Sequence, residues 1–161
     1  IELIKTIIDT REKLKRDNIQ TKSKANQNAW TGITQLEASS KSRSMYTTNN
    51  GVRTDLINSY AWSTALEYIN KMGSSDYINK KNTVTSILKT GQSGDKACNI
   101  YDMSGNISEW TTETATNSTG KCTYIGGGIG QQQGTAFSRY VSDTVSKSNS
   151  ISFRVIMYID N

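Results

Sequence analysis

Apolar residues recur at helical spacing in the first half of the chain and at strand spacing in the second half. The strongest helical pattern is TDLINSYAWSTALEYINKMG, residues 54–73, which carries a broad apolar face at Leu56, Tyr60, Trp62, Ala65, Leu66 and Ile69. Thr54 or Asn58 can cap its start, and Gly73 stands where a cap glycine ends a helix. This stretch predicts an amphipathic helix whose aromatic residues belong to the core.

Two further segments carry helical signals. Thr34 and Glu37 fit a capping box and predict a helix over residues 35–46. Residues 1–17 alternate charged positions with Ile and Leu at helical spacing, and they predict a packing or assembly helix, with an edge strand as the alternative. Residues 21–28 are polar and indicate a linker. We therefore expect an N-terminal segment at 1–26 and a folded domain at 27–161.

From residue 98 onward the pattern changes to strands. The sequences ISEWTTE, KCTYIGG and SISFRVIMYI are β-branched or aromatic, and clusters of Gly, Ser and Asn separate them. The last of these has apolar residues on both faces, which predicts a strand buried on both sides. Because helices precede strands, the predicted class is α+β.

Composition removes several kinds of chemistry. The 161 residues suit one domain with a modest core, since 34% are hydrophobic and the net charge is +5. The chain has no histidine, which excludes a Ser-His-Asp or Cys-His nucleophile and any His-ligated zinc or iron. Basic residues near the N-terminus are interleaved with acids, which is typical of a solvated helix face, so we expect no nucleic-acid partner.

The two cysteines, Cys98 and Cys122, are too far apart for a CxxC motif. They predict a disulfide and an oxidising, extracellular setting, with two buried free thiols as the alternative. No apolar run approaches the length of a membrane span.

The stretch NIYDMSGNISEWTTE, residues 99–113, does not fit a metal or catalytic loop. An EF-hand count from Asp102 puts Ile107 where the loop needs glycine. Glu109 and Glu113 would share one face of a strand, whereas glycosidase chemistry needs carboxyls facing each other across a cleft. The run YIGGGIGQQQG lacks the ending of a phosphate loop and predicts close backbone approach or a bulge.

The order IYDMSGNISEW, YIGGG, SRYVSD and SFRVIMYI resembles the C-terminal half of formylglycine-generating-enzyme (sulfatase-modifying-factor) domains. AWTGITQLEA and LINSYAWSTALEYI are similar to the helical segments of that family, so the resemblance covers Ala29 to Ile159. It implies a C-type-lectin-like fold, with two helices packed on a small twisted antiparallel sheet and long irregular loops. It also implies scaffold positions for Gly105, Asn106 and Trp110, with Arg154 as a structural partner.

Departures from the family pattern favour a non-enzymatic member. Formylglycine-forming members have cysteines before the last strand, where residues 126–152 contain none, and ergothioneine-type relatives hold iron with histidines. The family's calcium sites would fall near Lys96 to Tyr101, where a Lys takes one expected ligand position, so we expect no cofactor, with a structural calcium as the alternative. Variable proteins of diversity-generating retroelements resemble the same fold without this chemistry, and they display ligand-contacting residues before the last strand.

The segment before the last strand, QQQGTAFSRYVSDTVSKSNS, is rich in adaptable hydrogen-bonding side chains. We expect a non-enzymatic, surface-displayed module that binds a protein or glycan and lies outside the cell or on a cell or virion surface. The ligand-binding candidates are Gln131, Gln132, Gln133, Ser138, Arg139, Tyr140, Asp143, Thr144 and Asn149. The alternatives are an assembly subunit, such as the distal domain of a pilus, fibre or phage tail that oligomerises through residues 1–17, and an oxidase or adaptor of the formylglycine-generating type.

Overall fold

A computed structural model describes residues 23–46, 51–116, 119–131 and 134–159 of the chain. The helical elements are α2 (Gln35–Arg43), α3 (Ser59–Met72) and the 3₁₀ turn η2 (Tyr77–Asn79). The strands are β1 (Val52–Leu56), β2 (Lys96–Ala97), β3 (Ile100–Tyr101), β4 (Ser108–Thr114), β5 (Lys121–Ile125), β6 (Arg139–Asp143), β7 (Ile151–Phe153) and β8 (Val155–Ile159). The helix predicted at residues 1–17 lies outside the described residues, and the domain boundary after residue 26 stays a prediction.

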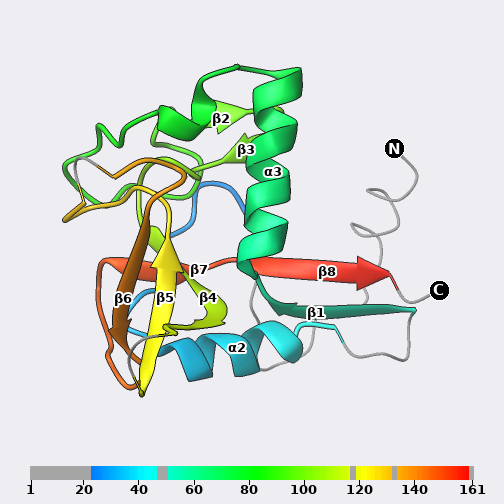
Figure 1. The fold of residues 1–161 in the computed structure, drawn as a ribbon, viewed down its shortest axis with the longest axis vertical. Coiled ribbons are helices and arrows are strands. Elements are labelled where there is room, and N and C mark those ends of the chain that lie inside the picture. The colour runs from blue at the N-terminus through cyan, green and yellow to red at the C-terminus, as the bar shows by residue number, and fades with distance from the viewer. Residues whose placement is uncertain (1–22, 47–50, 117–118, 132–133, 160–161) are drawn as a thin grey trace.

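The strands form three small sheets, which confirms the α+β class. The largest has the order β6-β5-β4-β7, in which the β4–β7 pair is parallel and the other pairs are antiparallel. β1 pairs with β8, and β2 with β3, both antiparallel. In Figure 1 the β1–β8 pair lies between the two helices, while β4, β5 and β6 stand on the other side of the molecule. The arrangement is the C-type-lectin-like fold that the resemblance implies.

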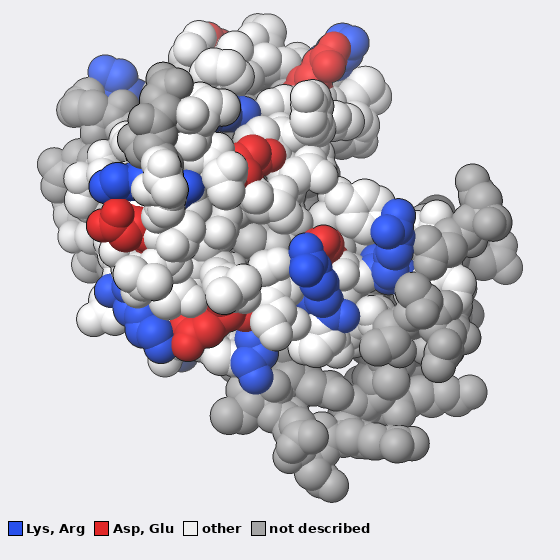
Figure 2. Space-filling view, turned by 60° about the horizontal axis from the view of Figure 1, so that its bottom comes forward, with Lys and Arg blue, Asp and Glu red and all other residues white. Residues whose placement is uncertain are grey.

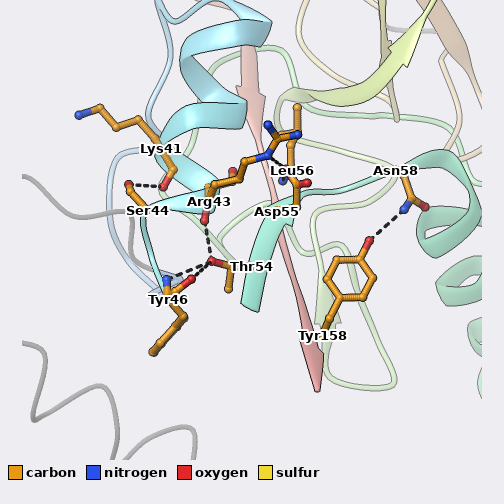
Figure 3. Close-up of polar contacts among 10 residues, drawn as sticks. Lys41, Arg43, Ser44, Tyr46, Thr54, Asp55, Leu56, Asn58 and Tyr158 are labelled. Carbon is orange, nitrogen blue, oxygen red and sulfur yellow. Dashed lines mark hydrogen bonds and ion pairs between the residues drawn. The ribbon is translucent and has the colours of Figure 1, made fainter. Parts of the chain in front are cut away.

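The capping box predicted at the start of α2 is present. The Glu37 backbone N–H donates to Thr34 Oγ1, and Glu37 Oε2 accepts the Thr34 backbone N–H. α2 ends at Arg43, three residues before the predicted end. Beyond it, Thr54 Oγ1 donates to the Ser42 carbonyl at 2.6 Å and accepts the Tyr46 N–H at 3.1 Å, as Figure 3 shows. This buried hydroxyl therefore ties the end of α2 to β1.

Helix α3 begins at the second of its two predicted caps. Asn58 Oδ1 accepts the Ala61 N–H at 2.8 Å, and Gly73 ends the helix as expected. Thr54 and Leu56 lie instead in β1, where β8 supplies the backbone partners. Asn58 also donates through Nδ2 to the Tyr158 hydroxyl at 3.1 Å (Figure 3), so the helix cap contacts β8 as well. Pairing with a distant strand therefore overrides the helical pattern before Asn58.

The last predicted strand is two strands, β7 and β8, which separate at Arg154. β7 pairs with β4, whereas β8 leaves that sheet and pairs with β1. The prediction that this strand is buried on both faces is wrong for β8, because Val155 to Tyr158 are all half-buried and Ile159 is exposed. Its apolar residues pair with an edge strand rather than crossing the centre of a sheet.

Two clusters form the core, and each contains a fully buried tryptophan. Trp62 packs with Leu66, Ile69, Tyr77, Met103 and Ile125, and its indole N–H donates to the Ala136 carbonyl at 2.8 Å. Trp110 packs with Ile33, Leu56, Cys122 and Ile151, and its N–H donates to the Ile33 carbonyl at 2.9 Å. Burying a tryptophan with its N–H satisfied is strongly stabilising, since truncation of such a residue costs about 3–5 kcal/mol.

The cysteines are not joined in the structure, which differs from the predicted disulfide. Cys98 is half-buried against the Trp62 cluster, whereas Cys122 is buried within the Trp110 cluster. Because the two thiols pack into different clusters, each behaves as a small apolar side chain. Free thiols are the alternative that the sequence left open, but only Cys122 is fully buried.

The glycine run after β5 marks close backbone approach, as predicted. A Cβ on Gly127 would lie 2.1 Å from the Ser104 carbonyl oxygen, and one on Gly128 would lie 2.4 Å from the Ser108 nitrogen. Asn106, in the facing loop, has a φ of 68°, a left-handed conformation that asparagine tolerates. The glycines therefore let the backbone pack directly against the loop that precedes β4.

Candidate functional site

Two acidic residues of the 99–113 stretch, Asp102 and Glu109, bind protein groups rather than lining a cleft. Glu109 accepts two hydrogen bonds from Arg154, at 2.8 Å to Oε2 and 2.9 Å to Oε1. Arg154 Nη2 also donates to the Tyr101 carbonyl at 2.9 Å. A bidentate guanidinium–carboxylate pair of this kind is geometrically specific. The structural partner that the resemblance assigns to Arg154 is therefore Glu109.

Both carboxylate oxygens of Asp95 and of Asp102 likewise accept hydrogen bonds from protein donors. Asp95 is buried and accepts the Tyr77 hydroxyl at 2.7 Å, the Lys80 ammonium at 2.8 Å and the Ser104 N–H at 2.6 Å. Asp102 accepts the Gly91 N–H at 2.7 Å and the Ser93 hydroxyl. Within the described residues no three Asp, Glu, Cys or His side chains form a metal-binding group. These carboxylates hold the irregular loops in place.

A groove lies on one face of the β4–β5–β6 sheet, beside the first turn of α3. Its volume is about 630 Å³ and it is open to solvent. A second hollow of about 500 Å³ shares its walls near the turn between β4 and β5. Most of the residues that line the groove have polar side chains, and its walls are formed by Ser59, Glu113, Thr114, Ala115, Thr116, Lys121, Thr123, Arg139, Tyr140 and Val141.

Glu113 lines the groove, and it carries a carboxylate oxygen that no protein group in the described part of the chain satisfies. Its Oε1 accepts the Ser59 backbone N–H at 2.5 Å, at the start of α3, where the helix dipole favours a carboxylate. Its backbone carbonyl accepts a hydrogen bond from Gln35 Nε2 at 3.1 Å. Oε2 is buried and has no hydrogen-bond partner among the described residues. Leaving such an oxygen without a donor costs about 1–3 kcal/mol, and a donor from a ligand would offset this.

Arg139 contributes a positive charge that is held in a fixed position. Nη2 donates to Ser63 Oγ of α3 at 3.1 Å, and Nη1 donates to the Phe137 carbonyl at 2.8 Å. The guanidinium carbon also lies 4.9 Å from the centroid of the Phe137 ring, within the range of a cation–π contact. At the other end of β6, Lys121 forms a 3.0 Å ion pair with Asp143. The groove therefore has mixed charge rather than one sign.

Tyr140 points to the opposite face of β6 from Arg139, because consecutive strand residues alternate. Its ring stacks on Tyr124 with centroids 5.2 Å apart, and Tyr124 packs edge-on against Trp110. Burial raises the pKa of Tyr124, while a hydrogen bond with the side chain of Gln131 opposes the shift. Tyr140 and Gln131 thus belong to the packed side of the sheet, although Tyr140 is also among the residues that line the groove.

The other predicted binding residues are distributed around the sheet. Ser138 Oγ accepts the Thr135 N–H at 2.8 Å in the turn before β6. Thr144 lines the second hollow, and its N–H donates to the Gly120 carbonyl at 3.0 Å. Asn149 lies beside Gly32 and does not line the groove. Gln132 and Gln133 lie outside the described residues. The structure brings Arg139, Asp143 and Thr144 to the groove side and separates them from the rest.

Sequence reasoning missed the groove residues that lie outside the segment before the last strand. Strand alternation contains a signal for two of them, since Lys121 and Thr123 fall on the face opposite Cys122 and Tyr124. The contact of Glu113 with Ser59 has no local signal, because it depends on where the start of α3 meets the end of β4.

Basic and acidic side chains are mixed on the face shown in Figure 2, without a continuous basic patch. Ion pairs among the described residues include Arg43–Asp55 at 3.0 Å and Lys147–Glu37 at 2.8 Å. None of the described helices has the length and apolar character to cross a membrane.

Comparison with known proteins gives a clear family match. Residues 15–158 match the model of the sulfatase-modifying factor enzyme 1-like domain. No curated protein sequence matches the chain. Among solved structures, the chain is similar to PvdO from Pseudomonas aeruginosa, with 15% identity and a TM-score of 0.61 over 84% of this chain and 63% of that one. It is also similar to CarF, with 17% identity and a TM-score of 0.56 over 80% of this chain and 58% of that one. The chain thus spans less than two thirds of either structure.

Proposed function

The chain belongs to the family of sulfatase-modifying factor enzyme 1-like domains, and from this premise we propose that it is a non-enzymatic binding module. Its ligand is a protein or glycan that contacts the groove beside α3. The observation that carries this proposal is the groove itself, where a buried acceptor of Glu113, the anchored guanidinium of Arg139 and threonine hydroxyls line one exposed sheet face.

The chemistry of the groove supports a polar ligand. Glu113 places a carboxylate with one unsatisfied, buried oxygen in the wall of the groove, while Arg139 and Lys121 offer donors. Ser59, Thr114 and Thr123 add groups that can donate or accept. Phe137 is exposed beside Arg139, and it supplies the apolar surface that both sugars and peptide side chains contact. A ligand with alternating hydroxyl or amide groups and apolar patches fits this arrangement best.

The placement of the reactive side chains supports a non-enzymatic role. Cys98 and Cys122 lie in different clusters, so they do not offer a thiol pair for the oxidase alternative. Burial raises the pKa of Cys122 to about 11, which keeps it in the unreactive thiol form near neutral pH. Asp95, Asp102 and Glu109 each have both carboxylate oxygens hydrogen-bonded to protein donors. A binding role needs none of these groups. We propose in addition that the module is displayed outside the cell or on a cell or virion surface.

The test is a screen followed by measurement with matched variants. A printed glycan array and a displayed peptide library serve as probes, and the best ligand is then titrated by calorimetry. We expect Arg139→Ala and Glu113→Gln to weaken binding about 10–100-fold, since each removes a charge-assisted hydrogen bond. Lys71→Ala and Glu67→Gln, which alter an exposed ion pair on α3, are the controls.

The proposal would be wrong if both groove variants bound the selected ligand as tightly as the controls do. It would also be wrong if neither probe yielded a ligand with millimolar or better affinity. Tyr140 is not a suitable test residue, because its replacement would disturb the stack on Tyr124 rather than a contact in the groove.

A further inference from the structure

β6 is the last strand on one side of its sheet, and one of its backbone edges faces outward. β5 is the strand that pairs with it, and Figure 1 shows β6 as the outermost strand of this sheet. The Gly126 N–H donates to the Ser138 carbonyl and the Thr144 N–H donates to the Gly120 carbonyl, so even-numbered residues form the hydrogen-bonded pairs with β5. The N–H and C=O groups of Arg139, Val141 and Asp143 therefore point away from β5.

The sequence of this edge is complementary to itself. In an antiparallel pair centred on Val141, Arg139 of one strand lies opposite Asp143 of the other, and the reverse holds at the other end. Val141 then faces Val141, and its side chain is 54% exposed. Phe137 and Val145, two residues beyond the ends of β6 and 57% and 80% exposed, fall at matching ends. In this register each charged side chain thus lies opposite one of opposite charge, and each apolar side chain lies opposite another apolar one.

Exposed edges with free backbone groups are normally blocked, because they pair readily with other chains. β6 has no proline or bulge in its register with β5, and its two charges match rather than repel in the self-paired arrangement. We propose that β6 pairs with β6 of a second copy of this chain in an antiparallel, two-fold symmetric dimer. The occupant of the edge is the same strand, and this proposal does not rest on the proposed function.

The pairing makes defined contacts. The two Val141 residues exchange N–H to C=O hydrogen bonds, and the Asp143 N–H of each copy reaches the Arg139 carbonyl of the other. The Asp143 carbonyl already accepts the Ser146 N–H at 3.0 Å, so it adds nothing. Asp143 lies between Lys121 of its own chain and Arg139 of the second copy. Asp143 therefore keeps its ion pair with Lys121 and gains a second one with Arg139 of the other copy, and no like charges lie opposite each other.

The dimer joins two sheets into one and places both grooves on the same side. A two-fold axis between antiparallel edge strands is perpendicular to the sheet, so Arg139, Val141 and Thr123 of both copies line one continuous face. Two linked sites on one face increase the avidity for a repetitive ligand. A five-residue edge is small beside a standard interface of about 800 Å² per partner, so we expect weak association that rises with chain concentration.

The test compares charge variants alone and mixed, by sedimentation velocity from about 10 µM to 1 mM chain, the range suited to weak interfaces. Arg139→Asp places Asp opposite Asp143, and Asp143→Arg places Arg opposite Arg139, so each variant alone should lose at least about tenfold in association. An equimolar mixture of the two restores both opposite-charge pairs, and it should form a heterodimer within about threefold of the original affinity. Lys71→Glu on α3 is the charge control.

Val141→Pro tests the backbone edge separately. Its N–H points away from β5, so proline should abolish dimerisation while circular dichroism and the melting temperature stay close to those of the original chain. The proposal is overturned if the original chain stays monomeric at 1 mM, if the mixed charge variants do not associate, or if a dimer forms that none of these changes affects. The last result would assign the interface to another surface, such as the exposed side of α3.

Discussion

Replacing Arg154 with alanine is expected to destabilise the fold strongly, because it leaves Glu109 charged and buried. The side chains of Arg154 and Glu109 are 28% and 11% exposed, and two hydrogen bonds of 2.8 and 2.9 Å join them. Removing one partner of such a buried pair costs about 3–5 kcal/mol. The Tyr101 carbonyl loses its donor as well. For a chain of this size each kcal/mol lowers the melting temperature by about 2–4 °C, so we expect a fall of roughly 6–20 °C.

The same pair predicts a non-additive double variant. Glu109→Leu with Arg154→Leu removes both charges, and well-packed apolar replacements of buried pairs are often close to neutral. The double variant should therefore be more stable than Arg154→Ala alone. Urea unfolding followed by tryptophan fluorescence measures each variant, and equal m-values would show that the unfolded states are comparable. A loss below about 1 kcal/mol for Arg154→Ala, the range of an exposed pair, would refute the reasoning.

Two further predictions concern single titratable groups. Without reductant, native protein at pH 8 should react with iodoacetamide at Cys98 alone, because burial raises the pKa of Cys122 to about 11. Both thiols should react when the protein is unfolded in urea. If neither cysteine reacted in urea, the two would be joined in a disulfide. The hydrogen bond from Lys147, with that from Thr34, lowers the pKa of Glu37 from 4.5 to about 2, so its contribution to stability is present above pH 4.5 and lost as the pH falls toward 2. Glu37→Gln should thus be less stable than the original chain at pH 7, and the difference should close between pH 5 and pH 2; a difference independent of pH would contradict the assignment.

Local chemistry predicted the elements whose signals lie within a few residues of one another. The capping box at Thr34 and Glu37, the cap at Asn58 and the glycine after α3 all depend on neighbouring positions. The close approach at Gly127 follows from the absence of a side chain. These features could be predicted from the sequence because the residues that determine each of them lie close together along the chain.

Distant pairing decided the features that the sequence did not reveal. β1 forms because β8 pairs with it, and the last strand divides because Arg154 turns to Glu109. Residues 139–143 are not among the strands that the sequence pattern predicts, although β5 pairs with them as a strand. The predicted binding candidates fall within one continuous segment, residues 131–149, whereas the groove combines strand faces with the start of α3.

The β1–β8 pair also has a consequence for synthesis of the chain. Val52 pairs with Ile159, and Leu56 with Val155, so about a hundred residues must be made before β1 meets its partner. Contacts this far apart in sequence slow folding, because a long loop closes before they form. During synthesis on the ribosome, β1 therefore cannot pair with β8 until the residues of β8 have emerged, although α2 can already pack beside β1. Until then β1 presents an unpaired edge, which makes the nascent chain a natural client for chaperones.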